Sequence, residues 1–232
     1  MRIGTCLGVL ILLFGLSLVP GTAFAEGRGS GGVKIGISAA GQYGADTGGF
    51  AYVDEEIGEI RVSDMESTTG FMFGVFVQYK INNVISLQPE VFFTRKGTVQ
   101  QIEIAGISAE TRWRLDYVEA PILLRLSLPT KLSVVPSIFG GPALAIAISS
   151  RQGIGIHETW EYEINIEEIV QDNDFGVVVG GALNIDVGPA LVVVDGRYSF
   201  GLVSWYITGD EDIDVEIKHR VGSIMVGVAS PF

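Results

Sequence analysis

Cysteine and histidine are the residues that this sequence almost lacks. Its 232 residues include one cysteine, Cys6, and two histidines, His157 and His219. A disulfide framework is therefore excluded, and an enzyme that needs a histidine general base has only two candidates for it. Runs of about 18 or more apolar residues are absent as well, so no segment is predicted to cross a membrane as a helix.

The N-terminal segment has the three-part layout of a secretory signal peptide. Arg2 gives a basic start, residues 7–19 form an apolar run, and Ala23 and Ala25 make an A-x-A cleavage site. The apolar run is shorter than the roughly 20 residues of a transmembrane helix. We predict a signal peptide at residues 1–25, a short linker at 26–32 and one domain at 33–232. The mature chain then contains no cysteine, because Cys6 is removed.

Acidic residues outnumber basic ones by 27 to 15, which gives a formal net charge of −12. A chain this negative disfavours nucleic acid as a partner. Almost half of the residues are nevertheless hydrophobic (47%), so the acids must be concentrated in part of the chain. They fall into four stretches between apolar segments, at residues 46–66, 103–110, 158–174 and 210–216.

Aspartates in two of these stretches are candidate metal ligands. Asp210, Asp212 and Asp214 alternate on one face, and carboxylate oxygens suit Ca²⁺, but the glycine and bidentate glutamate of an EF-hand loop are missing. The pair Asp172 and Asp174 is equally open. We interpret the stretches as solvated loops, which could attract divalent cations, and we assign no metal-binding or cofactor-binding residue.

The apolar segments between the acidic stretches have a period of two. In residues 71–79 every odd position is apolar or aromatic, whereas the even positions include Gly74 and Gln78. Such alternation is typical of β-strands. We predict eight strands, at about residues 33–41, 70–81, 84–98, 112–127, 132–148, 174–187, 190–203 and 218–230.

The predicted connections alternate between short and long. Three are tight turns, at residues 81–83, 128–131 and 188–189, and four are long and polar, at residues 42–69, 99–111, 149–173 and 204–217. This layout is typical of outer-membrane barrels, in which ring closure pairs every backbone group. The predicted fold is all-β: an eight-stranded antiparallel up-and-down transmembrane β-barrel. Its termini and short turns should be periplasmic and its long acidic loops extracellular.

The phase of the alternation also predicts what fills the barrel. If the apolar set faces lipid, charged residues of the other set point inward and should form ion pairs, with Glu90 or Glu119 joined to Arg125 or Arg197. A barrel of eight strands is filled by its side chains, so a general porin is not expected. The charged residues of this inward set are Glu90, Glu119, Arg125, Asp195 and Arg197.

Aromatic residues should form two interfacial girdles around such a barrel. Near the long loops these are Phe71, Phe93, Trp113, Trp205 and Tyr206, and near the tight turns Tyr79 and Phe232.

Two alternative functions stay open at this point. His219 and Ser223 are four residues apart and face the same side of a strand, so an outer-membrane barrel enzyme that modifies lipid acyl esters is conceivable. The simpler interpretation is a histidine at the membrane interface beside Lys218 and Arg220, and no catalytic residue is assigned. A soluble periplasmic barrel of the lipocalin type would also have eight strands, but its apolar residues would point inward.

Short motifs along the mature chain resemble the PorT-like outer-membrane β-barrel family. The longest is LDYVEAPILLR at residues 115–125, which is similar to the family's Tyr-Leu-Glu-Ile-Pro-Leu-Leu-Leu-Lys strand. The last strand departs from the pattern at Ser230, where a hydrophobic residue is usual, but keeps the terminal Phe232. Other matching stretches are residues 32–36, 69–74, 87–91, 96–97, 139–142, 174–176 and 196–202.

This resemblance implies an integral barrel in the outer membrane of a Gram-negative cell. It implies outer-membrane lipid as a partner, and the barrel-assembly machinery during biogenesis. It does not imply one activity, so the expected role is structural or surface-binding, with no particular extracellular ligand.

Overall fold

The computed structural model describes most of the predicted domain. The described residues are 28–43, 50–54, 58–64, 66–104, 107–130, 132–156, 159–165, 173–203 and 218–232. All the elements among them are β-strands, and no helix there is long and apolar enough to cross a membrane. The predicted signal peptide and parts of the acidic stretches, with His157, Asp172, Asp210, Asp212 and Asp214, lie outside the described residues.

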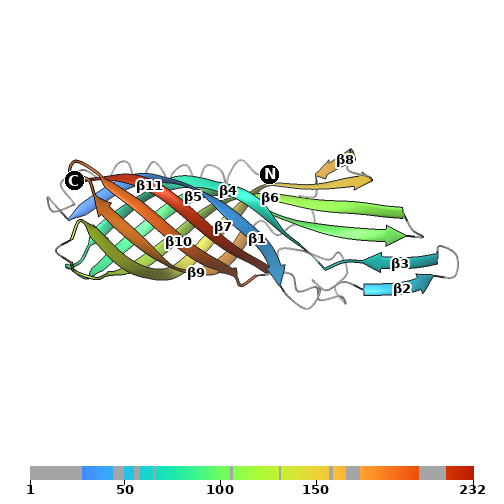
Figure 1. Ribbon diagram of the computed structural model, residues 1–232, viewed down its shortest axis with the longest axis horizontal. Helices are drawn as coiled ribbons and strands as arrows, with labels where there is room; N and C mark the ends of the chain where they lie inside the picture. The colour runs from blue at the N-terminus through green and yellow to red at the C-terminus, as the bar shows by residue number, and fades with distance from the viewer. Residues whose placement is uncertain are drawn as a thin grey trace.

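Eight of the eleven strands close into a ring (Figure 1). Around the ring each strand pairs antiparallel with the next, and β6 closes it by pairing with β5. The prediction of an eight-stranded antiparallel barrel is confirmed. In ring order the strands are β5 (Ile85–Ile104), β4 (Glu66–Lys80), β1 (Gly29–Tyr43), β11 (Lys218–Pro231), β10 (Leu191–Gly201), β9 (Asn173–Asp186), β7 (Val134–Ile156) and β6 (Ile107–Ser127).

Side chains of the barrel are apolar outside and largely polar inside. On β1 Val33, Ile35 and Ile37 are exposed, whereas Lys34 and Ser38 are buried. A soluble barrel would need the reverse arrangement, because water would surround its outer face. The outward apolar set instead matches a hydrocarbon surrounding, and the lipocalin-like alternative is rejected.

Three strands extend furthest into the predicted loops. The residues expected to form a loop at 99–111 continue β5 and β6, which stay paired as far as Ile104 and Ile107. Likewise β7 extends through Ile156 into the predicted loop 149–173. The prediction was wrong because apolar and polar residues do not alternate here as they do where one face of a strand meets lipid. The β-branched residues of this part of the chain still favour strands.

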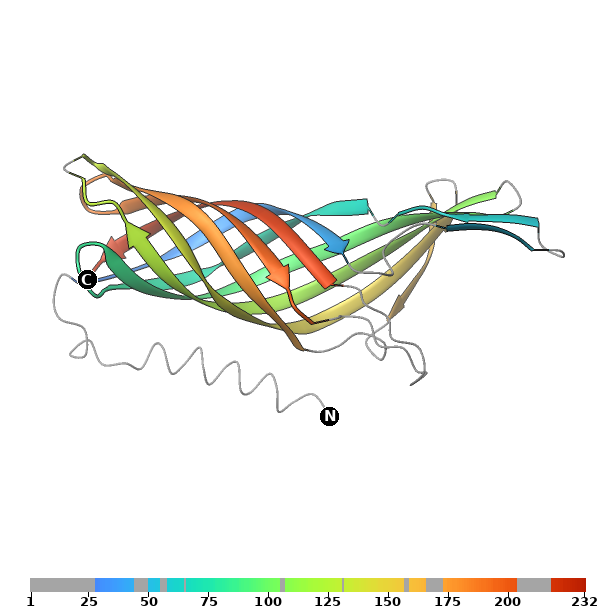
Figure 2. The same cartoon turned by 90° about the horizontal axis from the view of Figure 1, so that it is seen from below.

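A sheet protrudes from the barrel at the loop end (Figures 1 and 2). It consists of the extended parts of β5, β6 and β7 together with three short strands from the predicted loops. The hairpin of β2 (Phe50–Asp54) and β3 (Gly58–Val62) joins through β3 to β5, and β8 (Thr159–Asn165) pairs with β7.

The opposite end of the barrel carries the tight turns, the start of β1 and the end of β11. The N–H of Phe232 donates to the Gly29 carbonyl at 3.0 Å. In one turn the Asn82 side chain accepts from the N–H groups of Val84 and Ile85, both at 2.8 Å. Gly188 has a φ of 95°, which favours glycine, and its N–H donates to Asp186 Oδ1 at 2.8 Å. The two ends of the ring, at Gly29 and Phe232, and the tight turns therefore share one end of the barrel, as predicted.

We predict that Ile35→Arg, in the middle of the outward series of β1, lowers the free energy of unfolding by about 2–4 kcal/mol. The reason is that it would place a guanidinium in hydrocarbon. Urea unfolding of the barrel refolded in phosphatidylcholine vesicles measures this. The control Leu132→Arg, in a turn where Leu132 is 74% exposed, should cost under about 1 kcal/mol. Equal losses would contradict the assignment of the β1 outer face to lipid.

Candidate functional site

A network of four charged side chains occupies the centre of the barrel. Lys34 Nζ on β1 lies 2.9 Å from Glu90 Oε1 on β5 and 2.5 Å from Asp195 Oδ2 on β10. Arg197, also on β10, places Nη1 2.6 Å from Glu90 Oε2 and Nη2 2.8 Å from Asp195 Oδ2. Two cations thus meet two carboxylates, and each charge contacts both of the opposite sign.

These four side chains are almost completely removed from solvent, with exposed fractions of 2% or less. Charges in such a position are stable only when partners of opposite sign replace water. Gln88 adds a further hydrogen bond by donating Nε2–H to Glu90 Oε1 at 2.6 Å. The network is therefore neutral in sum and joins three strands across the lumen.

A second charged cluster lies nearer the loop end. Lys96 Nζ on β5 is 2.9 Å from Glu119 Oε1 on β6 and 3.5 Å from Asp174 Oδ2 on β9. The ammonium also stands 4.4 Å from the centroid of the Tyr117 ring. The Tyr117 hydroxyl lies 3.3 Å from Nε2 of His219. Asp174, considered above as a metal ligand, here belongs to an ion pair.

The predicted inward set is confirmed, but only one of its pairings is. Glu90 pairs with Arg197 as expected, whereas Glu119 pairs with Lys96. Arg125 donates from Nη1 to Asn184 Oδ1 at 3.0 Å and stacks over Phe139, and within the described part of the chain no carboxylate forms an ion pair with it. Lys34 and Lys96 were missed, although each shares the inward phase of its strand.

Large side chains fill the interior around these charges. Arg125, Tyr117, Phe92, Leu115 and Leu123 are among the largest fully buried side chains of the protein. The Arg197 guanidinium lies over Phe92 at 5.2 Å and over Phe139 at 5.3 Å. The lumen thus holds a packed mixture of ion pairs and aromatic rings.

His219 and Ser223 do not form a catalytic pair. They lie on the same side of β11, as expected, and both point inward, but four residues of extended strand separate their Cα atoms by about 13 Å. His219 is 2% exposed and lies beside Tyr117, so the expected position at the membrane interface was wrong. Among the described residues no group of three or more His, Cys, Asp or Glu side chains could hold a metal ion.

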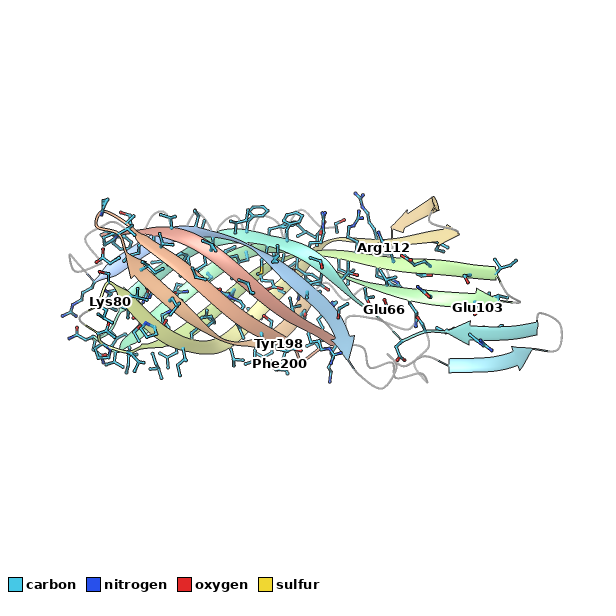
Figure 3. The ribbon with its side chains drawn as sticks, in the orientation of Figure 1. Glu66, Lys80, Glu103, Arg112, Tyr198 and Phe200 are labelled. Atoms are coloured by element: carbon cyan, nitrogen blue, oxygen red, sulfur yellow. The ribbon has the colours of Figure 1, made fainter. Side chains whose placement is uncertain are left out.

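Aromatic side chains gather on the outer surface toward the loop end. Phe71, Phe73 and Phe93 stack on one another with ring centroids 5.3–6.2 Å apart. Tyr198 and Phe200 form a second outward pair on β10 (Figure 3). The predicted positions of Phe71 and Phe93 are confirmed, and Trp205 and Tyr206 lie outside the described residues. The prediction was wrong for Trp113, which has the inward phase of β6 and lies opposite the buried Thr98. Phe73, Tyr198 and Phe200 were not singled out from the sequence.

A closed barrel with an apolar outer face and a charge-paired lumen defines an integral membrane β-barrel. The model of the family described as "Outer membrane protein beta-barrel domain" matches residues 31–206. The chain belongs to this family, and its barrel is an integral outer-membrane domain. No curated protein sequence matches the chain significantly.

Several solved structures are similar to this chain. The neisserial surface protein A is 17% identical with a TM-score of 0.47, over 87% of this chain and 97% of that one. OprG from Pseudomonas aeruginosa is 11% identical with a TM-score of 0.47, over 90% and 98%. Ail of Yersinia pestis is 15% identical with a TM-score of 0.37, over 88% and 99%. At these TM-scores the likenesses carry no functional argument.

We predict that Arg197→Met destabilises the barrel by about 3–5 kcal/mol, because it leaves Glu90 and Asp195 buried with one cation fewer. The unfolding temperature on a semi-native gel should fall accordingly. Arg112→Met is the matched control, since the Arg112–Glu110 pair is 39% and 35% exposed and should contribute under about 1 kcal/mol. An unchanged temperature for Arg197→Met would show that water solvates this part of the lumen.

Proposed function

We propose that this protein displays a binding sheet at the bacterial surface on an outer-membrane barrel that does not conduct as a general porin. The length of three adjacent strands carries this proposal. β5, β6 and β7 contain 20, 21 and 23 residues, whereas a tilted strand needs only about 9–11 residues to cross the membrane. About half of each strand is therefore available outside the hydrocarbon.

The protruding sheet has features that suit recognition by strand addition. In the described part of the chain β2 pairs only with β3, and β8 only with β7. Each strand thus presents a backbone edge to which an extended segment of a partner can add. We propose an extracellular protein segment as the partner. Divalent cations at the acidic loops remain a secondary proposal, since most of those acids lie outside the described residues.

We propose that the termini and tight turns face the periplasm. The even number of ring strands puts both ends of the domain on the side of the tight turns. A signal peptide would deliver the chain from that side, and the terminal Phe232 would engage the barrel-assembly machinery there. The sequence resemblance further favours the PorT-like branch of the family. Outer-membrane lipid is then a permanent partner, and nucleic acid is not expected.

Neither transport nor catalysis is part of the proposal. Against transport, the ion pairs and buried aromatic rings support a lumen that is filled by side chains. Against catalysis, Ser223 lies too far along β11 for His219 to activate it. A lipid-modifying enzyme therefore has no specific observation in its favour.

The orientation predicts a difference between two single-cysteine variants. Ile107, at the tip of the protruding sheet, is 59% exposed, and Leu132 is exposed in a tight turn at the other end. In intact cells a membrane-impermeant maleimide should label Ile107→Cys but should label Leu132→Cys only after permeabilisation. The opposite labelling pattern would overturn the proposed orientation.

The binding role predicts a partner that depends on the sheet edge. The protein in nanodiscs should capture an extracellular or cell-surface protein, and a variant without residues 50–62 should lose it while its barrel still shows heat-modifiable migration on a gel. The control Leu132→Ala, at the turn end, should capture as well as the wild type. Equal capture by the deletion variant, or no capture by any variant, would leave the barrel with a structural role only.

A further inference from the structure

Arg125 on β6 is a buried cation whose hydrogen-bonding capacity is only partly used. The residue is 1% exposed, and its Nη1 donates to Asn184 Oδ1, which is a neutral acceptor. Among the described residues its Nε and Nη2 have no hydrogen-bond partner. Burial of a charge is costly unless an opposite charge and hydrogen bonds replace water. The neutral amide of Asn184 replaces it only in part.

The carboxylates nearest to Arg125 are already shared by other cations. Glu90 and Asp195 attract Arg125 through space. Each of them, however, is in direct contact with both Lys34 and Arg197. Three cations therefore face two carboxylates in this part of the lumen, and the excess positive charge is that of Arg125.

The two unpartnered nitrogens form one edge of the guanidinium group. Nε–H and Nη2–H point in the same direction and match two oxygens of one carboxylate. Arg95 shows this arrangement in the same chain, because its Nε and Nη2 donate to the two oxygens of Asp116 at 2.6 and 2.9 Å. In Arg125 the same edge lies inside the barrel, and no carboxylate of the described residues occupies it.

A cavity of about 480 Å³ lies beside Arg125 at the turn end of the lumen. Residues from all three tight turns line it, at the end of the barrel that Lys80 marks in Figure 3. Two of the lining residues adjoin Arg125: Asn184 accepts its hydrogen bond, and Ser86 is its direct cross-strand partner. The guanidinium group therefore lies directly behind the wall of this cavity.

The lining of the cavity suits a small molecule that is part polar and part apolar. Gln78 and Ser86 are buried polar residues of its wall, and Val135 and Leu191 are half-buried apolar ones. Its charged lining residues, Lys80 and Asp186, are exposed and opposite in sign. The charge that distinguishes the site is therefore the buried one behind it.

We propose that this cavity binds a small organic acid. The carboxylate reaches the Nε–Nη2 edge of Arg125, and the apolar body packs on Val135 and Leu191. Asn184 stands between the cavity and the guanidinium group, and a turn of its side chain lets the amide N–H donate to the same carboxylate. The apolar part of the lining favours an organic acid over an inorganic anion. This binding site goes beyond the proposed surface role and lies at the opposite end of the barrel.

The first test compares benzoate with benzamide, a neutral molecule of nearly the same shape. Isothermal titration calorimetry on the barrel in a neutral maltoside detergent, at constant ionic strength, measures both affinities. Benzoate should bind about tenfold or more tightly than benzamide, because only benzoate forms hydrogen bonds between two charged groups. A wild type without this preference would overturn the proposal, and so would equal displacement of benzoate by inorganic phosphate.

The second test places a carboxylate beside Arg125 within the chain itself. Asn184→Asp hardly changes the size of the side chain but gives the guanidinium group an internal counter-charge. It should raise the unfolding temperature on a semi-native gel, because a buried charge becomes paired. It should also weaken benzoate binding about tenfold or more, since the site is then occupied. An unfolding temperature that stays the same or falls would show that Arg125 is already compensated, and would contradict the site.

Ser133→Asp is the matched control for added charge. Ser133 is exposed in a tight turn at the same end of the barrel and is not a lining residue of the cavity. Its benzoate affinity should stay within about twofold of the wild type at about 0.15 M salt, because salt screens exposed charges beyond roughly 8 Å. An equal loss in Ser133→Asp and Asn184→Asp would mean general repulsion of anions from this end, and would overturn the assignment to Arg125.

Discussion

Backbone hydrogen bonding in a medium without water is the constraint on which the rest of this structure depends. The first and last barrel strands, β1 and β11, meet along their whole length, from Ser30–Pro231 to Tyr43–Lys218, so the ring has no open edge. Closure gives every strand one face toward lipid and one toward the lumen. With eight strands the lumen is only wide enough for side chains, and inward charges must neutralise one another within it.

The central ion pairs follow from that confinement. Lys34, Glu90 and Asp195 belong to strands β1, β5 and β10, which are not neighbours in the ring, so their contacts cross the lumen instead of running along the wall. They connect residues 56 and 161 positions apart in the sequence. Removing one partner leaves the other charge buried without a counter-charge, which strongly destabilises the fold. A polar interior and a stable barrel are therefore compatible only while the pairing is complete.

The same constraint explains how far the sequence predicts the structure. Within the membrane, lipid imposes an apolar phase of period two, so all eight ring strands and the inward position of Glu119 and Arg125 could be read from the sequence. Beyond the membrane both faces meet water and the apolar phase disappears, so residues 99–104 were interpreted as a loop although they continue β5. The ion-pair partners depend on strand stagger and cross-lumen distance, which sequence periodicity does not contain, and Glu119 therefore pairs with the unpredicted Lys96.

The change from closed ring to open sheet occurs along β5, beyond its last pair with β4. From Ser86 to Val99 the neighbour of β5 on this side is β4, and from Ile102 to Ile104 it is β3, so β5 changes partners between Val99 and Ile102. β6 continues through this region without interruption and carries Glu119 in the lumen and Ile107 at the tip. The strand that supports the protruding sheet is therefore continuous with the barrel wall, and it passes through the level where the ring no longer supports that sheet.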